Sequence, residues 1–299
     1  MKIALCFIIS YEHVLQKENY WIKWIEENKD LFNIYFHYKT KSKIKSQWIL
    51  KYCIPEKYIK RTTYYDVVPA YMTLLTYAHE HDKNNQWFCM LTDSCAPIIS
   101  PEKFKKIFLN NYNKSIIKCG KAHWNIDLHQ RANLRLFTKE YHLCNDPWFT
   151  LCRYHVHLCT LFMVGQNKLY NTINNGGLAN ESIFAIILQT FNELNKNKIL
   201  NTSSTICDWS RMSNPTSPHL FNKCSTIDEN IILNLLDSNQ HALFLRKVNH
   251  TFPDDKLIEL SSWNKNENEK IINAKNINAK NIILFIFFAI CFAKIFMNF

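Results

Sequence analysis

The chain has 299 residues, enough for one large α/β domain or two small ones, and its content of 47% hydrophobic and 14% aromatic residues excludes a disordered protein. The formal net charge of +11 favours anionic partners such as nucleotide diphosphates, although the many Lys and Asn residues also reflect the composition typical of an AT-rich genome. No basic block is interleaved with aromatic residues, so we expect no nucleic acid as a partner.

The amino-terminal segment predicts a strand, a helix and a second strand. Residues 3–9 are apolar, and polar residues follow from Ser10 without a small-residue cleavage site, so this run indicates a core strand rather than a signal peptide. Residues 14–32 carry apolar side chains at helical spacing, and residues 33–38 alternate as a strand. Such an order is typical of the βαβ unit of a nucleotide-binding half-domain.

Residues 64–98 hold the most informative pattern of the chain. Their first half has apolar residues at three- and four-residue spacing, which predicts a helix, and residues 87–91 form an apolar run typical of a strand buried on both faces. Ligands bind beyond the carboxyl ends of strands in an open α/β sheet. We therefore expect Asp93, Ser94 and Cys95 at the mouth of a binding site.

The remaining elements are shorter, and their apolar runs are separated by polar loops. We expect strands at 52–61, 115–119, 205–209 and 242–248, and helices that begin at Pro101 and span 152–164, 183–194 and 231–236.

The organising segment also carries a family resemblance. Its helix, followed by the run Gln86-Trp87-Phe88-Cys89-Met90-Leu91-Thr92-Asp93-Ser94-Cys95-Ala96-Pro97, resembles the core-2/I-branching β-1,6-N-acetylglucosaminyltransferases and their plant and algal relatives. The resemblance extends, in the right order, over residues 3–250. It implies a GT-A nucleotide-sugar transferase fold over residues 1–263: one α/β domain with a mostly parallel central sheet flanked by helices.

The resemblance also implies a function. It indicates an inverting, metal-independent glycosyltransferase that moves a sugar such as GlcNAc from a UDP-sugar to the hydroxyl of a glycan or glycoprotein, without a further cofactor. The alternative is a non-catalytic, membrane-tethered module of the same fold that binds sugar or nucleotide.

Glu181 is the candidate catalytic base. Taken alone, a carboxylate at the start of an apolar helix is more often a residue that complements the helix dipole. In the resembled family, however, an acidic pair opens a helix and its Glu is the base, and Glu181 matches that position, with Asn180 in place of the first acid. An inverting transfer needs one such carboxylate to take the proton of the acceptor hydroxyl.

Two further groups of residues are candidates for binding the nucleotide sugar. Arg246 and Lys247 follow a strand, where basic pairs are usually solvated, but the family has a Lys here that neutralises the diphosphate. The sequence has no Asp-x-Asp motif, in agreement with a family that works without a metal. His37 lies in a segment that resembles the family's nucleotide-contacting strand end, with Tyr38 in place of its acid, so Asp93 is a further candidate.

Aromatic residues are candidates for the acceptor site. Trp148 and the pair Asp208 and Trp209 match family motifs, and Trp124 lies in an irregular basic stretch. Aromatic rings stack on sugar faces, although a buried Trp is the more frequent case. Residues 152–159 hold two Cys and two His, but their spacing fits no common zinc module, and we expect no metal site there.

The carboxyl-terminal region predicts a membrane anchor. Residues 264–281 form a polar low-complexity linker, and residues 282–299 form an apolar tail that can span a membrane if Lys294 reaches the interface. An amphipathic core helix is the alternative. Lysines before the tail place the main domain in the cytosol, with the Golgi or ER lumen, where relatives work, as the alternative. The Asn- and Lys-rich composition suits a protein of a large DNA virus or of a protist.

Overall fold

The computed structural model describes residues 1–212, 214 and 216–263. Met1–Ser261 forms the first compact unit of the chain. The predicted linker (264–281) and membrane tail (282–299) lie outside the described residues. Within the described part of the chain, no helix combines the length and apolar character needed to cross a membrane.

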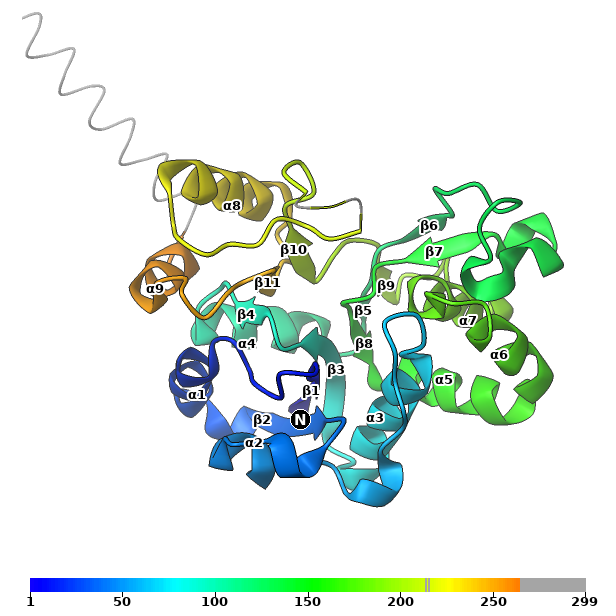
Figure 1. Ribbon diagram of the computed structural model, residues 1–299, viewed down its shortest axis with the longest axis horizontal. Helices are drawn as coiled ribbons and strands as arrows, with labels where there is room; N and C mark the ends of the chain where they lie inside the picture. The colour runs from blue at the N-terminus through cyan, green and yellow to red at the C-terminus, as the bar shows by residue number, and fades with distance from the viewer. Residues whose placement is uncertain (213, 215, 264–299) are drawn as a thin grey trace, which may run out of the picture. The chain divides into compact units, whose positions relative to one another are not determined.

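A six-stranded sheet forms the centre of the first unit, in the order β2-β1-β3-β8-β5-β9 (Figure 1). Its strands are β1 (Lys2–Ile8), β2 (Phe32–His37), β3 (Asn85–Thr92), β5 (Ser115–Ile116), β8 (Thr150–Cys152) and β9 (Ile199–Leu200). β1 pairs in parallel with β2 and β3, β5 pairs in parallel with β9, and only β8 runs antiparallel to its neighbours. The predicted fold class, an α/β domain with a mostly parallel central sheet flanked by helices, is confirmed.

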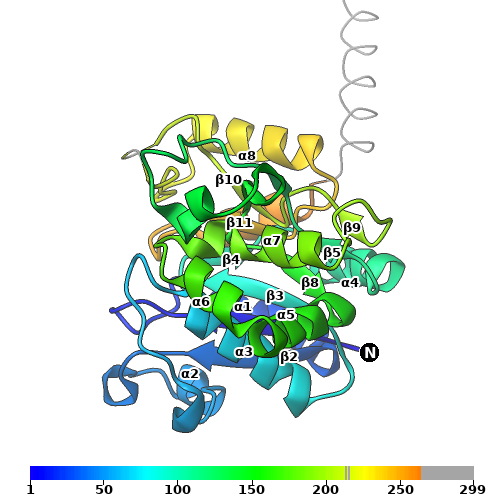
Figure 2. The same ribbon diagram turned by 90° about the vertical axis from the view of Figure 1, so that its right-hand side faces the viewer.

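Helices cover both faces of this sheet, because successive side chains of a strand point to opposite faces. In β3, Trp87 and Leu91 join a core cluster with Trp21 of α1 (Glu18–Glu26) and Phe104 of α4 (Pro101–Asn111). Phe88 of β3 packs on the opposite side, against helices α3 (Val68–His81), α5 (Arg153–Gly165) and α7 (Ile183–Thr190). Figure 2 shows α3 and α5 side by side next to the sheet. The continuous apolar run of β3 is therefore explained by burial on both faces.

Smaller elements complete the unit. A second sheet has the order β10-β11-β4, with β11 central, and a separate antiparallel pair joins β6 and β7. Their bounds, with those of the remaining helices, are β4 (Cys95–Pro97), β6 (Cys119–Lys121), β7 (Leu143–Asn145), β10 (Thr205–Cys207), β11 (Phe244–Arg246), α2 (Gln47–Lys51), α6 (Asn167–Asn174), α8 (Thr226–Ser238) and α9 (Asp254–Ser261).

The strand expected at 52–61 is reduced to a single parallel bridge between Phe36 and Cys53. The amide of Ile54 donates to the carbonyl of Phe36 at 3.0 Å, but the chain leaves β2 directly after it, at Pro55. A short 3-10 turn, Glu56–Tyr58, takes its place. The prediction was wrong in extent because the chain turns away from β2 after Ile54.

His37, at the end of β2, is buried as a neutral base. Its side chain is 1% exposed, and its Nε2 accepts a hydrogen bond from the Lys60 amide at 3.0 Å. Burial, together with the charge of Lys39, lowers its pKa from 6.5 to about 4. The unfolded chain therefore binds a proton below pH 6.5 that the folded chain excludes until about pH 4.

We expect His37 to make the protein less stable as the pH falls from 6.5 to about 4, by about 3 kcal/mol in total, since each unit of pKa corresponds to about 1.4 kcal/mol. Urea unfolding at several pH values should show that the free energy of unfolding falls less steeply with decreasing pH in His37→Gln than in the wild type. The exposed His129→Gln is the control and should keep the wild-type slope. Equal slopes in all three proteins would contradict the assignment.

Candidate active site

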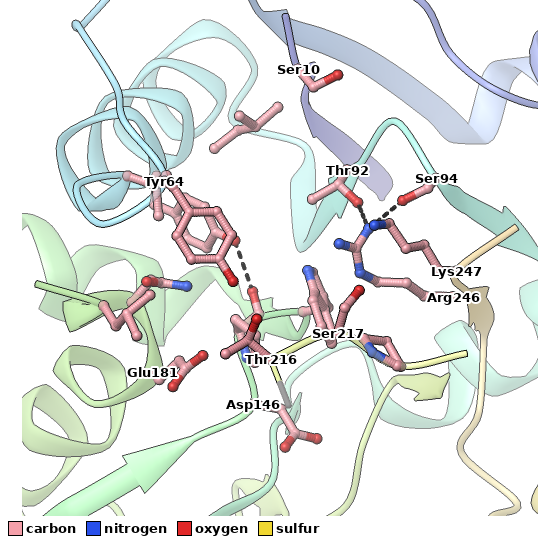
Figure 3. A pocket seen from close by; sticks show the side chains of 18 of the residues that line it. Ser10, Tyr64, Thr92, Ser94, Asp146, Glu181, Thr216, Ser217, Arg246 and Lys247 are labelled. Atoms are coloured by element: carbon pink, nitrogen blue, oxygen red, sulfur yellow. Dashed lines mark hydrogen bonds between the residues drawn. The ribbon is translucent and has the colours of Figure 1, made fainter. Parts of the chain in front are cut away.

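A cavity of about 1040 Å³ opens at the carboxyl ends of β1, β3 and β11. One wall comes from these strand ends: Ser10, Glu12, Thr92, Asp93, Ser94, Arg246 and Lys247 line it. The opposite wall comes from β6, from the turn after β7 and from the 3-10 turn Ala179–Glu181 before α7. Figure 3 shows that Glu181 lies across this space from Arg246 and Lys247.

Arg246 is held in a fixed orientation. It is the last residue of β11, and its Nη1 donates to the hydroxyl of Thr92 and, at 2.5 Å, to that of Ser94 (Figure 3). The guanidinium carbon lies 4.2 Å from the ring centre of Trp148, a cation–π contact. Among the described residues, its Nε is buried without a hydrogen-bond partner. Nη1 of the guanidinium is thus bound to two hydroxyl groups, while Nε has no hydrogen-bond partner among the described residues.

Lys247 adds a second positive charge beside it. Burial lowers the pKa of its ammonium group, and so does the charge of Arg246, while Asp93 and Glu12 act in the opposite direction. Asp93 is itself fixed, because its Oδ2 accepts from the Ser10 amide at 3.0 Å. Two adjacent cations on this wall favour an anionic ligand.

Glu181 is a partly buried carboxylate with one basic partner. Its Oε2 accepts from Nη1 of Arg131 at 2.9 Å, and the Arg131 guanidinium lies 5.0 Å from the ring centre of Trp124. Burial raises the pKa of Glu181 above its ordinary value, against the opposing charges of Arg131 and His123. A carboxylate with a raised pKa in a cavity can accept a proton from a bound hydroxyl.

The structure brings most of the predicted site residues together. The cavity is lined by the predicted residues Glu181, Arg246, Lys247, Asp93, Ser94, Trp124, Trp148 and Trp209. His37, Cys95 and Asp208 are not among the described residues that line it. Their predicted ligand contacts therefore gain no support from this geometry.

Each of these three side chains is buried and engaged elsewhere. His37 accepts the Lys60 amide, and the Sγ of Cys95 lies 3.4 Å from the Thr92 hydroxyl, so Cys95 supports the residue that binds Arg246. Asp208 accepts from Ser210 and, at 2.6 Å, from Nε of Arg211. Burial raises the pKa of Asp208, but these hydrogen bonds together bring it below its ordinary value. Asp208 therefore acts as the anchor of a local turn.

Sequence reasoning missed Arg131 and Asp146 as cavity residues. Asp146 follows β7, and its Oδ2 accepts from the Ser203 hydroxyl; burial raises its pKa. A polar turn directly before the apolar strand β8 was the signal available for Asp146. Arg131 gave none, since its stretch of sequence has no periodicity and its partner Glu181 lies 50 residues away.

Within residues 1–212, 214 and 216–263, no group of three or more His, Cys, Asp or Glu side chains is arranged to hold a metal ion.

The model of the Core-2/I-Branching enzyme family matches residues 3–232 of the chain. No curated protein matches it. Among solved structures, the chain is similar to a 4-diphosphocytidyl-2C-methyl-D-erythritol synthase from Anaerococcus prevotii DSM 20548, with 11% identity, a TM-score of 0.40, and coverage of 72% of this chain and 93% of that one.

We expect Arg131→Met to raise the pKa of Glu181 further, because it removes the opposite charge nearest to the carboxylate. Carbon-13 NMR titration of labelled glutamate carboxyl groups measures the change, with Glu181→Gln used to assign the signal. The matched control is Arg135→Met, an exposed arginine of the same segment. An unchanged titration of Glu181 in Arg131→Met would show that the ion pair does not form in solution.

Proposed function

The chain belongs to the Core-2/I-branching enzyme family, whose members are glycosyltransferases, and from this premise we propose that it transfers a sugar with inversion, from a UDP-sugar to a glycan hydroxyl, without a metal ion. GlcNAc is the proposed sugar. The proposal assigns the wall with Arg246 and Lys247 to the donor, and the wall with Glu181 to the acceptor hydroxyl.

The single observation that carries the donor assignment is the state of Arg246. Its guanidinium is fixed by Thr92, Ser94 and Trp148, and it lines the cavity next to the charge of Lys247. Two cations held side by side in this way suit a diphosphate, whose oxygens accept charge-assisted hydrogen bonds.

The reaction then follows from the two walls. The acceptor oxygen attacks the anomeric carbon, the bond from that carbon to the diphosphate oxygen breaks, and the hydroxyl proton passes to Glu181. The bonding electrons leave with UDP, whose developing charge Arg246 and Lys247 stabilise. Attack from the side opposite to the leaving group inverts the anomeric carbon.

Aromatic residues support the assignment of a sugar acceptor. Trp124, Trp148 and Trp209 line the cavity, and Trp209 is 47% exposed. Tyr64, which the sequence did not indicate, also lines it and is 59% exposed (Figure 3). Exposed rings beside a carboxylate are typical of sites that stack on sugar faces.

We further propose that the protein is tethered to a membrane through residues 282–299, with its main domain in the cytosol. The support is the apolar tail and the lysines that precede it. Two glycosylation sequons, at Asn180 and Asn249, flank the cavity residues Glu181 and Lys247. A glycan at either one would obstruct the cavity, which disfavours the secretory lumen.

We expect Glu181→Gln to lower turnover by 10²- to 10⁴-fold, the typical contribution of a general base, while UDP affinity stays unchanged. The full chain is assayed for UDP release with a panel of UDP-sugars and glycan acceptors in the presence of EDTA. Activity should also fall at acid pH, with a midpoint above the ordinary value for Glu because burial raises the pKa of Glu181. The exposed Glu140→Gln serves as the control.

Three outcomes oppose the proposal. Turnover that requires a divalent metal contradicts the metal-free mechanism, and full activity of Glu181→Gln contradicts the assignment of the base. A folded wild type that binds UDP but turns over no donor would favour the non-catalytic binding module, for which Asn180 and Tyr38 in place of family acids are the sequence argument.

We expect Arg246→Lys to weaken UDP binding by roughly 10- to 100-fold, since a charged hydrogen bond to a buried group contributes about 1.5–3 kcal/mol. Lys247→Met should weaken UDP binding in the same direction. The wild-type affinity should fall at high pH, and at a lower pH than for an ordinary lysine, because burial lowers the pKa of Lys247. Calorimetry with UDP measures the affinity of both variants and the pH dependence of the wild type. The control is Lys121→Met, on the opposite wall, which should bind UDP normally. Normal UDP affinity in Arg246→Lys would refute the donor assignment.

A further inference from the structure

Asn145, the last residue of β7, is a buried amide to which the proposed reaction assigns no role. Its side chain is 5% exposed. Its Nδ2 donates to the carbonyl of Asn180 at 2.9 Å and to that of Asp146 at 3.0 Å. Its Oδ1 accepts from the amides of Phe184 and Ala185, both at 3.1 Å. The amide thus joins the turn after β7 to the segment that carries Glu181.

These four bonds use the full hydrogen-bonding capacity of an Asn side chain, which has two donor hydrogens and two acceptor sites. They also fix its orientation, because two backbone N–H groups require the oxygen on one side and two carbonyls require the nitrogen on the other. Neither Asp nor any apolar residue can make the same set. Asp keeps the two acceptor sites but has no hydrogens for the carbonyls of Asn180 and Asp146.

The helix behind Glu181 depends on this amide for its first turn. Ser182 occupies the N-cap position of α7, but its side chain forms no capping hydrogen bond, and its Oγ is buried without a partner among the described residues. Instead, the side chain of Asn145, at the end of β7, accepts hydrogen bonds from two amides in the first turn of α7. The same side chain binds the carbonyl of Asn180, which forms the peptide bond to Glu181.

We infer that Asn145 is a positioning residue for Glu181. It fixes the 3-10 turn Ala179–Glu181 relative to α7, so that the carboxylate faces the cavity. The inference rests on the proposed function in that it takes Glu181 as the base. The side chain of Asn145 has two tasks: its oxygen caps α7, and its nitrogen fixes the Asn180 carbonyl that precedes Glu181.

Asn145→Asp separates these tasks. The carboxylate keeps the cap, and its charge is favourable at a helix N-terminus, but it can no longer donate to the Asn180 carbonyl. The matched control is Asn85→Asp at the start of β3. Asn85 is buried as well, and its amide donates to the Tyr35 hydroxyl at 3.1 Å and to the Ala78 carbonyl at 2.9 Å. It lies at the end of β3 opposite to the cavity.

Hydrogen exchange of the full chain is the first measurement. We expect Asn145→Asp to speed exchange in the segment 178–182 by tenfold or more, while the amides of Phe184 and Ala185 keep their protection. Asn85→Asp should lower the unfolding temperature but leave segment 178–182 unchanged. The second measurement is turnover, which should fall at least tenfold in Asn145→Asp with UDP affinity unchanged, and less in Asn85→Asp at equal loss of stability.

The inference is overturned if segment 178–182 exchanges as in the wild type, or if both variants lose turnover in proportion to their loss of stability. A wild type without turnover overturns the proposed function instead. In that case hydrogen exchange still decides whether Asn145 sets the conformation of the Glu181 turn.

Discussion

The attachment of Arg246 to the end of β3 is the interaction on which the site depends. Thr92 and Ser94 lie more than 150 residues before Arg246 in the chain, and their hydroxyls bind its guanidinium. The bonds join the central sheet to the second sheet, in which β11 pairs on one side with β4, the strand that follows Ser94. Cationic groups are therefore held at a fixed place above the strand ends, and little rearrangement is needed when an anion binds.

Unusual backbone completes the opposite wall beside β6 and the turn after β7. Gly176 has no space for a side chain, since a Cβ there would lie 2.1 Å from the Asn133 nitrogen. Gly177 and Leu178 both have positive φ, and the Gly177 carbonyl accepts from the Ala132 amide at 3.0 Å. Backbone of this kind persists only where its surroundings enforce it. Here it brings the segment of Arg131 against the turn of Glu181.

Burial is the main electrostatic influence on both walls, with opposite effects on acid and base. It raises the pKa of Glu181 and lowers that of Lys247, so each group is less stable in its charged form than in water. The neighbouring charges limit these shifts: Arg131 acts on the carboxylate, and Asp93 acts on the ammonium group. A bound diphosphate would favour the charged lysine, and so ligand and cation stabilise each other in the cavity.

The sequence by itself determined the class of fold and the ends of the key strands. The apolar run of β1 predicted a core strand and that of β3 a strand buried on both faces, and the polar residues after β3 predicted a site at its carboxyl end, where Asp93 and Ser94 do line the cavity. Motifs placed Glu181, Arg246 and Lys247 in one site although they lie far apart in the chain. These signals are local, because burial on two faces and the end of a strand leave their pattern in consecutive residues.

Tertiary structure alone decided which loops meet. Nothing in the sequence pairs Arg131 with Glu181 or places the Asn145 amide between Asn180 and α7, since each contact joins loops that are 35–50 residues apart. The partner of His37 was equally hidden from the sequence: its Nε2 accepts from the Lys60 amide, and the side chain is buried and does not line the cavity. Hydrogen bonds between loops depend on how the elements pack, and periodicity along the chain carries no record of that packing.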